Sequence, residues 1–276
     1  MVWRLLDFQS FNIFENMAID EAVFHETIRN HQPPTIRFYV SRPSAITIGY
    51  FQDAKKELNI EKCRREGIDI TRRITGGRAV FHFSEMTYSI AAGDHEKIFP
   101  ADVLGAYKII SRCIARGLSD LGINASLAGD GCSMKKDELP PCCFALPRRD
   151  ELLVNGRKIC GSAQVRKKGG FLQHGMLLLE FDAKKTAELI SCDRAPAPTE
   201  ARALKKSVTS IAEELAERVD ERELCFRMKK GFTDELGIEL EAGSITSAEE
   251  KLKDTLMKKY MDVDWIIERK KYFKAA

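Results

Sequence analysis

The chain has 276 residues, of which 44% are hydrophobic and 31% charged, and its formal net charge is +3. This composition is typical of an ordinary globular protein, and the length suits one large domain with or without a small C-terminal appendage. A nearly balanced charge does not favour nucleic-acid binding by bulk electrostatics. No apolar run in the sequence reaches the roughly 18 residues expected of a membrane helix.

The first residues indicate a cytosolic protein, and the cysteines are interpreted accordingly. The segment MVWRLLDFQSFN has neither a basic stretch followed by an apolar one nor a cleavage site, so we expect no signal peptide. In a reducing cytosol the eight cysteines would be thiols. They form no C-x-x-C pair, and no His lies at zinc-ligand spacing from them, so we expect no metal site. Most of them should be inert core residues.

In chain order, the first half of the sequence predicts mixed strands and helices. In the segment TIRFYV, Ile36, Phe38 and Val40 alternate with polar or aromatic residues, as expected of a half-buried strand. Asn59 can cap a short helix, and Gly122 can end a long amphipathic one. The predicted elements are strands over 3–9, 35–40 and 45–51, helices over 16–29 and 60–66, a strand–glycine loop–strand unit over 68–92, and a helix from Pro100 to Gly122.

Further along, the sequence predicts a β-hairpin and then a helical C-terminal part. Asn155-Gly156 is the strongest two-residue signal for a type I′ turn. With this turn, Leu153 faces Lys158 and Leu152 faces Ile159. The predicted elements are strands over 150–154, 157–161 and 171–181 and helices over 184–191, 207–220, 221–236 and 247–261. This mixture of hairpins and helices predicts an α+β fold.

The segment Arg72–His82, RRITGGRAVFH, is the first candidate for a binding site. Gly76 and Gly77 would let backbone N–H groups approach a ligand closely, and the arginines offer planar donors for phosphate or carbonyl oxygens. The segment is not a P-loop, because no Gly-Lys-[Ser/Thr] follows at the required spacing. The alternative is a hairpin turn with solvated arginines.

Cys143 is the candidate nucleophile. It follows Pro140-Pro141 and precedes the hairpin, so we expect it on a constrained loop. A thiol with an ordinary pKa of about 8.5 needs a nearby cation to react well at neutral pH. Lys158 could supply it, because its apolar cross-strand neighbour would leave its ammonium partly desolvated beside an anion. Taken alone, a cysteine usually packs in a core and a lysine faces solvent, and the pattern does not choose between Cys142 and Cys143.

Three ordered motifs, RRITGGRAVFH, GRKICGSAQ and QHGMLLL, resemble the catalytic domain of the lipoate–protein ligase and octanoyltransferase family, which is related in fold to the biotin–protein ligases. The resemblance covers most of residues 3–215. It implies mixed and antiparallel sheets flanked by helices, with a catalytic domain over 1–215 and a helical extension over 216–276 packed on it. It also implies that Arg72–His82 lines an acyl-binding tunnel and that Lys158 contacts the acyl carbonyl.

The segment before the hairpin resembles the octanoyltransferases of the ligase-like branch. Their motif is Cys-Phe-x-x-Pro with the cysteine fifteen positions before the lysine, and Cys143 precedes Lys158 by fifteen. This resemblance favours Cys143 over Cys142. Two features depart from the family pattern and leave acyl or carrier specificity open: Met176 follows His-Gly, and Arg148-Arg149 follow the proline.

The resemblance therefore implies a cytoplasmic acyltransferase in lipoate biosynthesis that needs no cofactor. An octanoyl group would pass from octanoyl-acyl carrier protein to Cys143, with Lys158 as its catalytic partner, and then to a lysine of a lipoyl domain such as the glycine-cleavage H protein. The implied substrate-binding residues are Arg72, Arg73, Thr75, Gly76, Gly77, His82, Gly161, Ser162, Ala163, Gln164, His174 and Gly175.

Other functions remain compatible with these motifs. The first alternative is an ATP-dependent lipoate–protein ligase in which Cys143 takes no part in the reaction. The second is a non-catalytic protein that binds acyl or lipoyl groups. The same Cys–Lys chemistry would also suit an amidotransferase that moves octanoyl between two lipoyl domains. Nucleic-acid binding is a more distant alternative, because the basic pairs lack interleaved aromatic residues.

Overall fold

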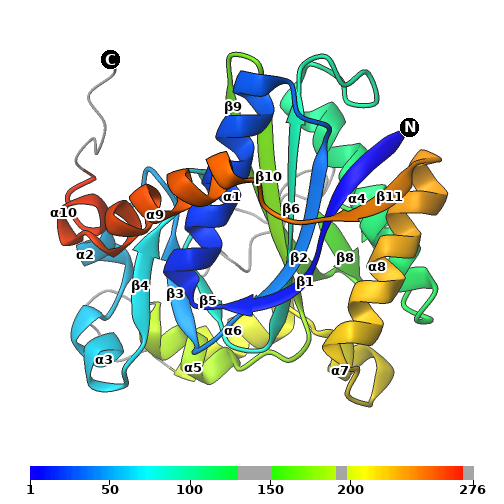
Figure 1. Ribbon diagram of the computed structural model, residues 1–276. Coiled ribbons are helices and arrows are strands. Elements are labelled where there is room, and N and C mark those ends of the chain that lie inside the picture. The colour runs from blue at the N-terminus through cyan, green and yellow to red at the C-terminus, as the bar shows by residue number, and fades with distance from the viewer. Residues whose placement is uncertain (130–150, 191–197, 270–276) are drawn as a thin grey trace.

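The computed structural model describes residues 1–129, 151–190 and 198–269. Two β-sheets form its centre (Figure 1). The larger sheet has the strand order β11-β1-β2-β6-β10-β9-β8-β7, and the smaller has the order β4-β3-β5. The strands of the larger sheet are β1 (Val2–Phe11), β2 (Thr35–Ser41), β6 (Glu85–Gly93), β7 (Ser126–Leu127), β8 (Leu152–Val154), β9 (Arg157–Lys167), β10 (Gly170–Leu178) and β11 (Glu239–Gly243). Those of the smaller sheet are β3 (Ala45–Ile48), β4 (Asp69–Arg72) and β5 (Val80–His82).

Both sheets mix parallel and antiparallel pairs. β1 is parallel to β2 and β11, and β3 is parallel to β4. From β2 onward, the strands β6, β10, β9, β8 and β7 pair antiparallel in succession, as do β3 and β5. Because helices flank these sheets, the structure confirms the predicted α+β class.

The helices surround the sheets, and none in the described ranges is both long and apolar enough to cross a membrane. They are α1 (Ile13–Asn30), α2 (Ala54–Glu57), α3 (Ile60–Arg65), α4 (Val103–Ser119), α5 (Ala183–Leu189), α6 (Pro198–Ser207), α7 (Ile211–Leu215), α8 (Glu221–Leu236), α9 (Ser247–Met261) and α10 (Val263–Ile266).

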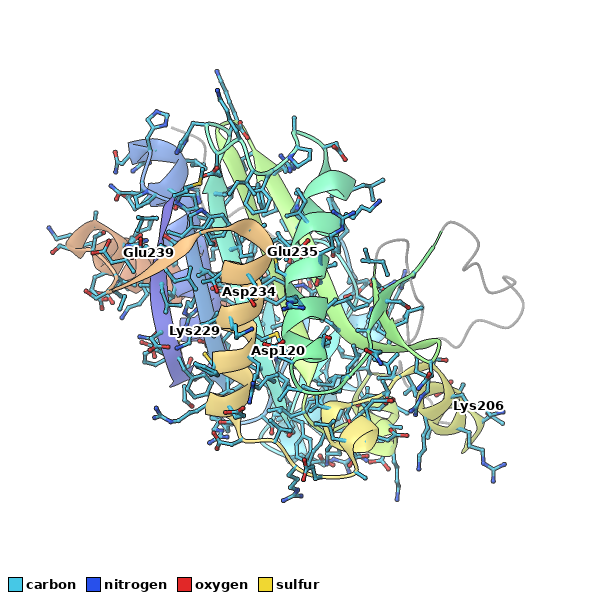
Figure 2. The ribbon with its side chains drawn as sticks, turned by 90° about the vertical axis from the view of Figure 1, so that its right-hand side faces the viewer. Asp120, Lys206, Lys229, Asp234, Glu235 and Glu239 are labelled. Atoms are coloured by element: carbon cyan, nitrogen blue, oxygen red, sulfur yellow. The ribbon has the colours of Figure 1, made fainter. Side chains whose placement is uncertain are left out.

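The two faces of the larger sheet are covered by different helices, because side chains alternate along each strand. α1 packs on one face, against residues such as Leu172 of β10. On the other face Tyr88 of β6 joins a core with α4 and α8, which lie side by side (Figure 2). These two helices approach closely at Gly117 and Gly231, since a Cβ on Gly231 would lie 2.6 Å from the Gly117 nitrogen.

The smaller sheet packs against β10 through a separate apolar cluster. Ile46 and Phe81 of the smaller sheet belong to the same cluster as Met176 and Leu178 of β10. Leu204 of α6 adds to the same cluster. This packing brings the Gly-Gly loop between β4 and β5 beside β9 and β10, where the candidate site lies.

Most of the predicted elements are confirmed, but the helix expected over 207–220 is wrong. α6 already ends at Ser207, and the extended backbone that follows pairs with β9, where Thr209 N–H donates to the Lys158 carbonyl at 2.9 Å. The Ser210 side chain then caps a new short helix, α7, which ends at Ala216 in a left-handed conformation. Pairing with a strand edge therefore leaves only the short helix α7 within the range predicted as one long helix.

Two further predictions need correction. The Asn155-Gly156 turn is confirmed, with φ values of 51° and 77°, and Leu153 faces Lys158 as predicted. Leu152, however, faces Cys160 instead of Ile159, because a β-bulge shifts the register by one residue. The second correction is β11, a strand within the part expected to be entirely helical, which adds to the edge of the larger sheet beside β1. The boundary at residue 215 stays a prediction.

The C-terminal part is attached to α1 by a buried ionic network. Lys259 Nζ and the Tyr260 hydroxyl donate to Glu21 Oε2 at 2.5 and 2.6 Å. Burial alone would raise the pKa of Glu21, but hydrogen bonds from His25, Lys259 and Tyr260 and the Lys259 charge outweigh it and lower that pKa to about 2. Since its ordinary value is 4.5, this network stabilises the fold above about pH 4.5 and loses that effect as the pH falls toward 2.

We expect Lys259→Met to lower the free energy of unfolding by roughly 3–5 kcal/mol at pH 7, because the buried Glu21 carboxylate loses the Lys259 charge that compensates it. Urea unfolding of the variant and the parent measures this difference. Lys258→Met removes the same group from an exposed position of the same helix and should change stability by less than about 0.5 kcal/mol. Equal effects of the two substitutions would contradict the assignment.

Candidate active site

A cavity lies between the smaller sheet and the β9–β10 region of the larger sheet. Nine of the predicted site residues line it: Arg73, Gly77, His82, Lys158, Gly161, Ser162, Ala163, His174 and Gly175. The structure adds residues that were not predicted: Met17, Tyr39, Thr47, Arg78, Val80, Thr87, Glu151 and Met176. Cys143 and its neighbour Cys142 lie outside the described residues.

The cavity runs across the strands of the larger sheet. Gly161 of β9 pairs with Met176 of β10, Met176 with Thr87 of β6, and Thr87 with Tyr39 of β2. These three strand spacings amount to about 14 Å. Met17 of α1 also lines the cavity. The shape suits an elongated and largely apolar group.

Lys158 and Glu151 form an ion pair in the cavity wall. Lys158 Nζ lies 2.8 Å from Glu151 Oε1, and both side chains are only 6% exposed. The prediction that Lys158 is desolvated beside an anion is confirmed as far as the described residues go, and the sequence pattern did not single out Glu151. A buried ammonium at this place can stabilise a developing negative charge more strongly than one in water.

Two histidines of the cavity wall share one arrangement. His82 Nδ1 lies 3.0 Å from Glu85 Oε1, and its Nε2 lies 3.0 Å from the Thr47 hydroxyl. His174 has a carboxylate at Nδ1 and a threonine hydroxyl, that of Thr75, at Nε2. In each case a carboxylate bonds Nδ1 and a threonine hydroxyl bonds Nε2, so both nitrogens of the ring are held by the protein.

The carboxylate beside His174 belongs to Asp20 of α1. It lies 3.1 Å from His174 Nδ1, accepts from Arg37 at 2.9 Å, and accepts from the Tyr39 hydroxyl at 2.8 Å. Burial lowers the pKa of His174, and the charges of Arg73 and His82 add to this, although Asp20 acts in the opposite direction. His174 is therefore a neutral and rigid part of the wall.

The two arginines of the RRITGG segment do not offer free donors to a ligand. Arg72 is fully buried and donates to backbone carbonyls of Gly49, Gln52 and Ile266, so it joins the smaller sheet to α10. Arg72 does not line the cavity, and its predicted role in substrate binding stays a prediction. Arg73 lines the cavity, but it donates to the carbonyls of Thr47, Gly76 and Arg78 and so shapes the loop; burial lowers its pKa to about 10.

The remaining predicted residues lie around the cavity rather than in its wall. Thr75 is fully buried and holds His174 through its hydroxyl. Gly76 and Gln164 line a second cavity, next to Val103, Leu104 and Tyr107 of α4. Four residues line both cavities: Gly77, Glu151, Ser162 and Ala163.

Comparison with known proteins finds relatives over most of the chain. A family model described as the lipoyl protein ligase A/B catalytic domain matches residues 12–233. The chain is 36% identical to octanoyltransferase LipM of Clostridioides difficile, over 95% of this chain and 97% of the relative. It is also 36% identical to octanoyltransferase LipM of Bacillus subtilis, over 97% and 98%. The chain belongs to the lipoyl protein ligase A/B catalytic domain family.

Solved structures of lipoate protein ligases share the fold. A bi-partite lipoate protein ligase from Thermoplasma acidophilum, studied with its E2 lipoyl domain, superposes with a TM-score of 0.84 at 23% identity and covers all of both chains. A crystal structure of lipoate-protein ligase A bound with ATP gives a TM-score of 0.79 at 24% identity, over 96% of this chain and 98% of that one. At this identity they establish the fold, which confirms the predicted fold family.

Within this family fold, the cysteines that the structure describes are poor nucleophiles. Burial raises the pKa of Cys160, which lies two positions after Lys158, to about 12, and it raises the pKa of Cys63 and of Cys225 to about 11. Burial also raises the pKa of Cys113. A thiol with a raised pKa is almost fully protonated at neutral pH and does not attack a thioester readily.

Sequence reasoning missed Asp20, although one signal for it exists. Asn16, Asp20 and Thr27 follow one another at helical spacing on the buried side of α1, among apolar residues. A polar residue at a core position of a helix implies a buried partner. Glu151 and Tyr39 carry no comparable signal, because carboxylates and tyrosines commonly occupy such positions.

The Gly-Gly loop also depends on Gly49, which the motif does not include. A Cβ on Gly49 would lie 2.1 Å from the Gly77 carbonyl oxygen, so only glycine lets the loop approach the end of β3. We expect Gly49→Ala to displace Gly77 and to lower the free energy of unfolding by about 1–3 kcal/mol.

Chemical denaturation of Gly49→Ala and Gly129→Ala tests this expectation. A Cβ on the exposed Gly129 would meet nothing within 4 Å, so that control should change stability by less than about 0.5 kcal/mol. If Gly49→Ala is as stable as the parent, the close approach does not position the loop.

Proposed function

We propose that this chain is an octanoyltransferase that moves an octanoyl group from octanoyl-acyl carrier protein to a lysine of a lipoyl domain. The observation that carries the proposal is the buried Lys158 ammonium in the wall of an elongated cavity, in a chain similar over 95–97% of its length to octanoyltransferases. Such a cavity suits a medium-length acyl chain with its carbonyl near Lys158.

Cys143 is the proposed nucleophile. It has the motif spacing to Lys158, and the cysteines that the structure describes are protonated by burial. The Lys158 charge would favour the Cys143 thiolate, although Glu151 already accepts from the same ammonium. Of the predicted binding residues, those that line the cavity would hold the acyl chain, whereas Arg72 and Thr75 would support it from outside.

The reaction has two balanced steps. The Cys143 thiolate attacks the thioester carbonyl, a new C–S bond forms, and the thiol of the carrier protein leaves as a thiolate that takes up a proton. In the second step the lysine amine of the acceptor attacks S-octanoyl-Cys143 and forms an amide, and its proton passes to the departing cysteine thiolate. Exchange between thioesters is nearly even in energy and amide formation is downhill, so neither step needs ATP or a cofactor.

The partners follow from this chemistry. The donor is an acyl carrier protein that presents its acyl group on a phosphopantetheine thiol, and the acceptor is a lipoyl domain, with the glycine-cleavage H protein as the proposed example. The proposed location is the cytoplasm.

Mixing the pure protein with octanoyl-acyl carrier protein and no ATP should produce one octanoyl adduct, because the thioester already carries the energy of transfer. Intact-protein mass spectrometry measures the adduct, and hydroxylamine should remove it, since a thioester is cleaved by that reagent. Cys143→Ala should abolish the adduct, whereas Cys142→Ala and Cys160→Ala should retain it.

The contrary outcomes identify the alternatives. Transfer that appears only with ATP and free octanoate or lipoate, and that survives Cys143→Ala, would indicate a lipoate–protein ligase. Binding of acyl compounds with no adduct and no transfer would indicate a non-catalytic carrier. Efficient transfer between two lipoyl domains, with little from acyl carrier protein, would indicate an amidotransferase.

A further inference from the structure

Three neighbouring strands bring Tyr88, Gly175 and Ser162 into one row. Gly175 of β10 pairs with Tyr88 of β6 on one side and with Ser162 of β9 on the other. Because Gly175 has no side chain, the two outer side chains meet over it, and the Tyr88 hydroxyl lies 2.7 Å from Ser162 Oγ. A Cβ on Gly175 would lie 2.4 Å from the Tyr88 ring and 2.5 Å from Ser162 Oγ. The glycine therefore makes this contact possible.

A chain of hydrogen bonds leads to this contact from the protein surface. Arg166 Nε donates to Gln164 Oε1 at 2.9 Å, and Gln164 Nε2 donates to Gln173 Oε1 at 2.8 Å. Gln173 Nε2 then donates to the Tyr88 hydroxyl oxygen at 3.0 Å. Arg166 is held in turn by the carbonyls of Pro100 and Asp102, each at 3.1 Å.

The donors in this chain can point in only one direction. A guanidinium cannot accept a hydrogen bond, so Arg166 fixes the orientation of the Gln164 amide, and that amide fixes the orientation of Gln173. Tyr88 and Gln173 are fully buried, and Tyr88 already accepts from Gln173. The other contact of the buried Tyr88 hydroxyl is Ser162 Oγ, so its proton is donated there rather than buried without an acceptor. The Ser162 hydroxyl is left as a donor whose nearest recorded acceptor is the Cys160 sulfur at 3.8 Å, which is a weak one.

Ser162 lies where its hydroxyl could donate to a bound substrate. Ser162 lines both the acyl cavity and the second cavity beside α4, and Glu151, the partner of Lys158, also lines both. An acyl thioester with its chain in one cavity and its carrier arm in the other would have its carbonyl at this junction. We propose, on the basis of the proposed function, that the Ser162 hydroxyl donates to the acyl carbonyl oxygen and that Tyr88 is the positioning residue that keeps this hydroxyl pointed toward it.

The arrangement suits stabilisation of an oxyanion. A donor that is oriented before the reaction begins costs no reorganisation in the transition state, and removal of one such donor typically lowers kcat by about 100- to 1000-fold. Burial raises the pKa of Tyr88 well above its ordinary value, so its hydroxyl keeps its proton at any pH at which the protein would work. Tyr88 therefore serves as a donor to Ser162 and not as a base.

A double-mutant cycle on single-turnover octanoyl transfer tests the proposal. Ser162→Ala should lower the rate of acyl-enzyme formation by about 100-fold with little change in KM, because the donor acts mainly on the transition state. Tyr88→Phe should lower the rate by about 10-fold in the parent but by less than 2-fold in Ser162→Ala, because without the serine the tyrosine has nothing to orient. Thr27→Val removes a buried hydroxyl that donates to the Val23 carbonyl within α1, away from both cavities, and should leave the rate unchanged.

The outcomes separate this proposal from the proposed function. If the parent protein forms no acyl-enzyme, the proposed function itself fails. If the parent is active and Ser162→Ala is equally active, the donor role of Ser162 is overturned. If both variants are folded and the effect of Tyr88→Phe on the rate is the same with and without Ser162, the positioning role of Tyr88 is overturned.

Discussion

The buried carboxylate of Asp20 is the interaction on which the cavity depends. It accepts hydrogen bonds from Arg37 and Tyr39 of β2 and lies beside His174 of β10, so one residue of α1 ties the helix to two strands. Burial of a charge costs several kcal/mol, and this cost is offset only when the partners keep their geometry. Although desolvation acts to raise the pKa of Asp20, the bond from His174 and the charge of Arg37 lower it, so the carboxylate stays ionised.

On the smaller-sheet side of the cavity, buried polar and charged side chains also hold one another in place. Glu85 of β6 holds His82 of β5 in the smaller sheet, and His82 contacts Thr47 of the neighbouring strand β3, which also accepts from Arg73. Polar groups of the cavity are thus largely occupied by one another rather than left to bind substrate. The binding energy available to a ligand then comes mainly from apolar contact along the cavity, and selectivity comes from its shape. Such a preorganised wall suits a substrate with few polar groups, such as an acyl chain.

The sequence allowed the local structure to be predicted well and the partners of its charged residues poorly. Alternation and turn residues located the strands and the Asn155-Gly156 hairpin, and the facing pair Leu153–Lys158 followed from turn geometry. Arg72 shows why the partners could not be predicted. Its motif indicated a ligand, but one of its acceptors is the carbonyl of Ile266, which lies 194 positions further along the chain. The same applies to Glu151, because nothing local distinguishes a carboxylate that will face a buried lysine.

The two cavities meet beside β9, next to the short strand β8. Among the described residues, β8 pairs with β9 only as far as Cys160, and Gly161 and Ser162 follow directly on β9. Ser162, Glu151 and Gly77 line both cavities, so a group bound at this point can reach into either one. In the proposed reaction, an acyl chain in one cavity and the group that carries it in the other would therefore present the same carbonyl to Ser162.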